Sequence, residues 1–176
     1  MDSQNAAPNP NHSLESYLAQ IESLLNLILR QGEFVLAFTI RHLSQEPGEA
    51  ESAEYMIDFT GADTDLLLER NGALLDALEH VVLKAVRLRE EHLRRITFDC
   101  DDWRRQRAEE LRLIAQVAAE RVLESGDPFA LGPMSPRERR IIHLALRDRP
   151  NLRTASEGVG PERHVVIQPA EPGGSR

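Results

Sequence analysis

Apolar residues in the first hundred positions change their spacing along the chain, and this change restricts the fold more than any other feature. Between residues 14 and 30 they recur every three or four positions, which is typical of a helix that buries one face. In segments 33–41 and 54–60 they alternate, which predicts two strands that pair as a hairpin. A chain that mixes the two periods in this way belongs to the α+β class.

The rest of the first half continues this mixture. After the hairpin we expect a short helical piece at 66–68, a break at 70–72, a longer helix over 73–89 and a third strand at 94–99. The longer helix is expected to bury a stripe formed by Leu74, Leu78, Val81, Val82 and Ala85. Residues 14–99 thus have the order α-β-β-α-α-β, which predicts one small domain with helices against a face of a sheet.

The second half predicts another small domain, over residues 100–169. A long helix over 102–124 comes first. The next helix begins after Ser135, a typical N-cap that is followed by proline and, three residues on, by the glutamate of a capping box. Two short strands at 152–156 and 163–168 flank a glycine-rich turn and are expected to form a β-hairpin.

Composition excludes several classes of function. The only cysteine, Cys100, allows neither an internal disulfide nor a cysteine-based zinc site, and this fits a reducing, cytoplasmic environment. No apolar run is long enough to span a membrane, and the polar ends at 1–13 and 170–176 are expected to be disordered tails. We find no phosphate-binding loop, nucleophile elbow, zinc-protease motif or acid–base pair of carboxylates, so we expect no cofactor, no metal and no enzyme.

Charge is distributed unevenly. The whole chain carries a formal charge of −8, which is unfavourable for a binder of polyanions. Residues 14–99 carry −8 by themselves, whereas residues 100–176 carry +1 and segment 135–163 carries +3. All basic residues of that segment are arginines, whose guanidinium groups bind phosphates in a bidentate manner and stack on bases. Local charge therefore permits nucleic-acid binding at the C-terminal end.

Residues 135–169 resemble the single-stranded nucleic-acid-binding domain named R-3-H after its Arg-x-x-x-His signature. That signature is RRIIH here, from Arg139 to His143. The strand LRTASEG (152–158) and the closing RHVVI (163–167) match the same domain at the same spacing.

The first half is similar to the bacterial Jag family (SpoIIIJ-associated proteins), in which a KH domain precedes the R-3-H domain. The stretch LERNGALLDAL (68–78) is similar to the family's Ile-Gly-Arg-x-Gly-x-Thr-Leu-Asp-Ala-Leu, and FDCDDWRRQR (98–107) is similar to its linker. The resemblance covers about residues 14–169 and implies a type II-like KH domain over 14–99.

Helical spacing places Arg139 and His143 one turn apart on one face. In one interpretation His143 packs internally and Arg139 pairs with Glu138 or Glu162. The resemblance favours the other, in which Arg139 binds a phosphate while His143 donates a hydrogen bond or stacks on a base or sugar. Supporting phosphate contacts are expected from Arg140, Arg147, Arg153 and Arg163.

The KH half lacks part of its expected binding loop. A KH domain holds about four nucleotides with a Gly-x-x-Gly loop, whose backbone approaches the phosphates. The corresponding residues here are Glu69, Arg70, Asn71 and Gly72. A carboxylate at the first position adds bulk and repulsion where a phosphate would bind, so this degenerate loop is expected to be a weak RNA site, a spacer or a protein-binding surface.

These observations predict a non-catalytic, regulatory protein that binds RNA or single-stranded DNA mainly through its C-terminal arginine surface. The resemblance also implies a second small KH protein as a partner. The alternative is a protein-interaction adaptor that keeps both folds and has lost its affinity for nucleic acid.

Overall fold

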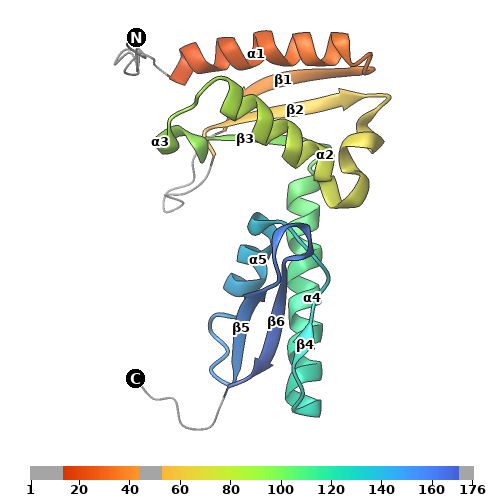
Figure 1. Ribbon diagram of the computed structural model, residues 1–176, viewed down its shortest axis with the longest axis vertical. Helices are drawn as coiled ribbons and strands as arrows, with labels where there is room; N and C mark the ends of the chain where they lie inside the picture. The colour runs from red at the N-terminus through yellow and green to blue at the C-terminus, as the bar shows by residue number, and fades with distance from the viewer. Residues whose placement is uncertain (1–13, 44–52, 171–176) are drawn as a thin grey trace, which may run out of the picture. The chain divides into compact units, whose positions relative to one another are not determined.

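The computed structural model describes residues 14–43 and 53–170 (Figure 1). The expected tail at 1–13, residues 171–176 of the tail expected at 170–176, and most of the connection between the first two strands lie outside the described residues. The chain divides into two compact units, with the boundary between Trp103 and Arg104. Each unit is described separately below.

The first unit consists of α1 (Leu14–Gln31), β1 (Leu36–His42), β2 (Tyr55–Gly61), α2 (Thr64–Ala85), α3 (Glu90–Leu93) and β3 (Ile96–Cys100). The sheet has the order β1-β2-β3. Strand β1 is antiparallel to β2, as expected for a hairpin, and β3 is parallel to β2. The parallel pair requires a crossover connection, and α2 and α3 provide it (Figure 1).

One face of this sheet carries the core of the first unit. Phe59 and Phe98 are fully buried, and their rings lie 5.7 Å apart on neighbouring strands. Helix α1 adds every third or fourth side chain, such as Ile21 and Leu25, and this confirms the apolar period expected for it. Cys100 is also buried there, and burial raises the pKa of its thiol to about 11, so the thiol stays protonated.

Strand β1 begins at Leu36, three residues later than expected, because the end of α1 occupies the intervening residues. The Phe34 amide donates to the Leu29 carbonyl at 3.0 Å, and Glu33 takes a left-handed conformation with a φ of 56°. This arrangement is a helix-terminating motif. Gly32 is needed beside it, because a Cβ at that position would lie 2.5 Å from the Phe34 ring.

The buried stripe of α2 differs from the expected one. Leu75, Val82 and Leu83 are buried, whereas Leu74 and Val81 are exposed. Apolar residues occupy a wider arc of this helix than the sheet can cover, so two neighbouring stripes both have helical spacing. The sequence alone does not distinguish them, and the expectation for Leu74, Val81 and Ala85 was wrong.

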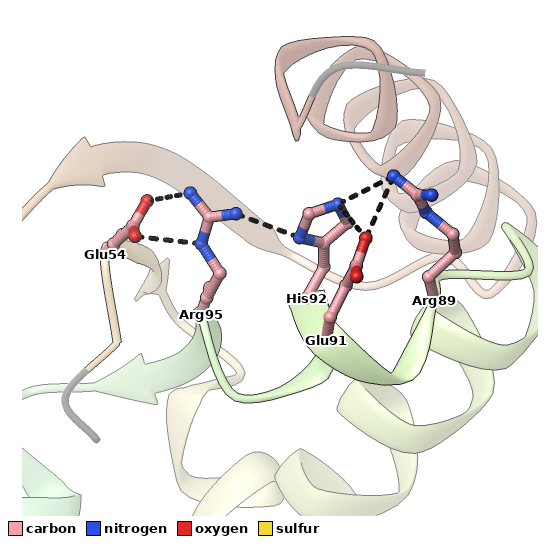
Figure 2. Close-up of polar contacts among 5 residues, drawn as sticks. All are labelled: Glu54, Arg89, Glu91, His92 and Arg95. Carbon is pink, nitrogen blue, oxygen red and sulfur yellow. Dashed lines mark hydrogen bonds and ion pairs between the residues drawn. The ribbon is translucent and has the colours of Figure 1, made fainter. Parts of the chain in front are cut away.

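A polar network fixes the starts of β2 and β3 (Figure 2). Arg95 donates to both carboxylate oxygens of Glu54 at 2.8 and 2.6 Å and to Nδ1 of His92 at 2.9 Å. His92 is buried, and Glu91 and Arg89 lie on its other side (Figure 2). The network joins the short helix α3 to the sheet.

The second unit contains most of α4 (Trp103–Ser125), then β4 (Phe129–Ala130), α5 (Pro136–Leu146), β5 (Leu152–Glu157), a 3-10 turn (Gly160–Glu162) and β6 (His164–Pro169). Strands β5 and β6 form the expected hairpin, and the short β4, which was not expected, pairs with the other edge of β6. Ile142, Val165 and Ile167 form the core together with one face of α4. Among the described residues, no helix combines the length and the apolar character needed to cross a bilayer.

A buried ion pair joins α4 to the start of α5. Ser135 accepts a hydrogen bond from the Glu138 amide, and the Glu138 carboxylate accepts one from the Ser135 amide at 2.8 Å, which confirms the capping box. The second carboxylate oxygen of Glu138 accepts from Nε of Arg107 at 2.7 Å. Glu138 thus neutralises an arginine and caps a helix with a side chain that is only 8% exposed.

We expect Glu138→Gln to lower the free energy of unfolding of the second unit by about 3 kcal/mol, because removing one partner leaves a buried charge without compensation. Native-state amide hydrogen exchange in α5 measures this change. Glu110→Gln is the matched control, since Glu110 pairs with the same arginine but is 56% exposed. Its cost should stay below about 1 kcal/mol. Equal costs for the two variants would contradict the role given to the buried pair.

Candidate nucleic-acid interface

Helix α5 places the two signature residues beside its buried face. Glu138, Ile142 and Leu146 point into the second unit, and Arg139 and His143 follow them by one position, so they flank this buried stripe. Arg139 and His143 are both partly buried. Helix α5 itself lies next to β5 (Figure 1).

Both ring nitrogens of His143 are occupied within the unit. Nδ1 lies 2.7 Å from the Thr154 hydroxyl, and Nε2 lies 3.0 Å from the Ser156 hydroxyl. A neutral imidazole accepts at one nitrogen and donates at the other, and hydroxyl groups serve both roles. His143 thus joins α5 to β5, as in the internal-packing interpretation.

Arg139 has a different environment. Its Nε is buried and is the only buried side-chain nitrogen or oxygen in the described part of the chain without a hydrogen-bond partner. Glu138, one of the two carboxylates considered as its partner, is occupied by Arg107 and by the helix cap. Buried donors are nearly always paired in folded proteins, so the Nε of this partly exposed arginine is an exception among the described side chains.

The other predicted arginines do not form one surface. Arg140 and Arg147 are exposed on the solvent side of α5, next to the row that Arg139 and His143 form. Arg153 is exposed, but strand alternation points it to the opposite face of the sheet from Thr154 and Ser156. Arg163 lies beyond the Glu157–His164 pair, at the same end of the hairpin as Ser156. The structure therefore brings Arg139, Arg140, His143 and Arg147 together along α5 and separates Arg153 from them.

The sequence analysis missed three residues that shape this surface: Thr154, Ser156 and Arg107. Thr154 and Ser156 lie on the same face of β5 as the buried Leu152, whereas Arg153 lies on the opposite face. Two hydroxyl residues on the inward face of a strand need polar partners, and that pattern was available as a signal. The partner of Arg107 is 31 residues away in the sequence, and no local pattern indicates it.

The degenerate KH loop interrupts α2. Arg70, Asn71 and Gly72 have φ values of 50°, 59° and 73°, so three successive residues are left-handed. Gly72 is buried, and a Cβ there would lie 2.5 Å from Cη2 of Trp103. Glu69 has an extended backbone with a φ of −53°, and its side chain is exposed. The loop thus needs glycine at its last position, while its first position presents a carboxylate to solvent.

No cluster of three histidine, cysteine, aspartate or glutamate side chains suited to a metal ion occurs within residues 14–43 and 53–170. The described parts of the chain therefore provide arginines and hydroxyl groups at this surface rather than metal ligands.

We expect the pKa of His143 to lie below its ordinary value of 6.5, because burial disfavours the charged ring and the Arg139 cation adds repulsion. The unfolded chain then takes up this proton first as the pH falls, so the second unit loses stability below about pH 6.5. Arg139→Ala should raise the pKa of His143, and Arg112→Ala on α4 should leave it unchanged. Nuclear magnetic resonance titration of the His143 ring protons measures the pKa in both variants. An unchanged pKa in Arg139→Ala would contradict the repulsion between Arg139 and His143.

Known proteins resemble this chain. Residues 109–169 match the family model of the R-3-H domain, the domain that the sequence analysis identified by its signature. The chain is 34% identical over 125 residues to RNA-binding protein KhpB of Clostridium symbiosum, an alignment that covers 71% of this chain and 56% of that protein. It is 34% identical over 110 residues to RNA-binding protein KhpB of Bacillus subtilis strain 168, covering 61% and 53%.

A third relative, RNA-binding protein KhpB of Lactiplantibacillus plantarum, is 30% identical over 111 residues, covering 63% of this chain and 34% of that protein. The chain spans about half the length of the first two relatives. Its C-terminal part matches the R-3-H domain and the longer alignments match KhpB proteins, so the chain is similar to proteins of the Jag (KhpB) family.

Proposed function

We propose that this protein binds single-stranded nucleic acid, with RNA as its main ligand, through the α5 surface of an R-3-H domain over residues 100–169. The unpaired Nε of Arg139 carries this proposal, because it is a buried donor at the protein surface whose nearest sequence partner is occupied. The names of the relatives support RNA as the ligand class. In this proposal the protein is non-catalytic and regulatory.

The proposed chemistry is phosphate binding by a guanidinium group. On binding, the Arg139 guanidinium turns outward, so that its Nε–H, which is covered in the free protein, and a terminal N–H donate to one phosphate as a bidentate fork, a geometry that suits a guanidinium better than an ammonium. Arg140 and Arg147 add positive charge along the same helix, and Arg163 adds it at the end of the hairpin. Such contacts are independent of sequence, so the affinity should depend strongly on salt.

His143 is a positioning residue in this proposal. Its bonds to Thr154 and Ser156 hold β5 against α5, and its ring lies one turn from Arg139. A neutral ring suits this role, since a second positive charge there would repel the Arg139 guanidinium.

The first unit is proposed as a KH-like domain over residues 14–99 whose loop contributes little to RNA binding. The exposed carboxylate of Glu69 and the net charge of −8 over these residues both disfavour a phosphate. A second small KH protein remains a partner that the family implies. The alternative role, a protein-interaction adaptor, is favoured for this unit by the exposed Leu74 and Val81.

We expect the double variant Arg139→Ala, His143→Ala to bind single-stranded RNA at least tenfold more weakly, because a charge-assisted hydrogen bond contributes about 1.5–3 kcal/mol. The plot of log affinity against log salt should also become less steep by roughly one phosphate contact. Fluorescence anisotropy of labelled RNA and DNA at two salt concentrations measures both effects. Arg112→Ala is the matched control, an exposed arginine on α4.

Two results would contradict the proposal in different ways. Absence of RNA and DNA binding by the wild type at low salt would refute the function. If the double variant bound as tightly as the wild type, or if Arg112→Ala weakened binding equally, the assignment of the surface would be wrong.

We expect Glu69→Gly to strengthen RNA binding several-fold, because it removes a negative charge and a side chain beside the only loop of KH type. The same titration, repeated with Arg139→Ala, His143→Ala in the background, isolates this contribution. Unchanged affinity would show that the loop does not contact RNA in either form, and this result would favour the adaptor role for the first unit.

A further inference from the structure

An apolar groove lies in the first unit, between the end of α1, the beginning of β1 and the face of α2. Its volume is about 320 Å³. It is lined by Ile28, Leu29, Phe34, Leu36, Leu67, Leu74, Ala77, Leu78 and Val81. Every lining side chain is aliphatic or aromatic, and three of them, Leu74, Leu78 and Val81, belong to the stripe that sequence reasoning expected to be buried.

Two exposed apolar side chains of the first unit lie in this groove. Its large exposed hydrophobic residues, among those described, are Leu27, Val35, Leu66, Leu74 and Val81. Of these, Leu74 and Val81 line the groove. Single exposed apolar residues are ordinary, but an open groove with an entirely apolar lining is typical of an interaction site.

The lining chemistry argues against a nucleotide or a small polar ligand. Single-stranded RNA bases are held by hydrogen bonds to their edges as well as by stacking. Small-molecule sites similarly combine apolar walls with a few polar groups that orient the ligand. None of the nine lining side chains carries a polar group. The surface complements a row of aliphatic side chains instead.

Charge in the first unit indicates which kind of partner fits the groove. Asp63 accepts a hydrogen bond from the Val35 amide at 2.6 Å, which places this carboxylate at the β1 end of the groove. Glu33 precedes the lining residue Phe34 in the sequence, and one basic residue, Arg30, follows the lining residue Leu29. With a net charge of −8 over residues 14–99, this unit attracts a basic partner and repels both RNA and a second copy of itself.

We propose that this groove docks the apolar face of a basic, amphipathic helix of another protein. Such a helix presents aliphatic side chains at positions i, i+3, i+4 and i+7 to the groove, while lysines or arginines on its flanks face the acidic side chains. This function is separate from nucleic-acid binding by the second unit, and it does not depend on that proposal.

Synthetic helical peptides with a fluorescent label test the proposal on the full chain by anisotropy. One peptide carries a leucine stripe flanked by lysines, a second carries the same stripe flanked by glutamates, and a third keeps the lysines but replaces the leucines by serine. We expect the first peptide to bind the wild type at least tenfold more tightly than either of the others, since docking needs both apolar contact and opposite charge.

Val81→Asp should weaken binding of the leucine–lysine peptide at least tenfold, because it places a charge in the apolar groove. Val117→Asp on α4 is the matched control, with the same change of charge at a side chain that is 59% exposed against 55% for Val81. It should leave peptide binding unchanged. Both positions are exposed in the fold, and RNA titration of Val81→Asp should match that of the wild type.

Four results would overturn the proposal. Equal binding of the serine–lysine peptide would mean attraction by charge alone, and equal binding of the leucine–glutamate peptide would remove the charge complementarity. If Val81→Asp weakened RNA binding, the groove would be a nucleic-acid site. If the wild type self-associated in analytical ultracentrifugation and Val81→Asp did not, the occupant would be a second copy.

Discussion

The structure of the second unit depends on one buried carboxylate. Glu138 closes the capping box of α5 through Ser135 and neutralises Arg107 on α4, so a single side chain determines where α5 begins and how it is held against α4. Either interaction alone would stabilise the unit modestly, but their combination gives both carboxylate oxygens a donor in a place where an unpaired charge would be costly. The position of every other residue on α5 follows from this arrangement.

The bonds of the Glu138 carboxylate also affect the neighbouring Arg139. Because Glu138 is occupied, Arg139 has no partner from the residue before it, and its Nε is buried without an acceptor. One turn further on, His143 is fully bonded to Thr154 and Ser156. The two signature residues therefore differ in role: one holds the surface in place, and the other carries an unused donor. This difference favours phosphate binding by the arginine, with the histidine as support.

The two units present different kinds of surface. The second has arginines along an exposed helix, and the first has an apolar groove in an acidic surface. Nucleic acid suits only the second, and a basic apolar helix suits only the first. Helix α2 produces the groove because its apolar arc is wider than the area that the sheet covers, so Leu75 and Val82 are buried while Leu74 and Val81 stay exposed.

The sequence by itself determined the order of the helices and strands apart from α3 and β4, the capping box at Ser135 and the candidate role of Arg139, because these follow from period and from neighbours within about four residues. Only the tertiary structure decided which stripe of α2 is buried, that Arg107 is the partner of Glu138, and that Arg153 points away from His143. Each of these depends on which surfaces of distant segments meet in the folded chain, and local spacing contains no information about such contacts.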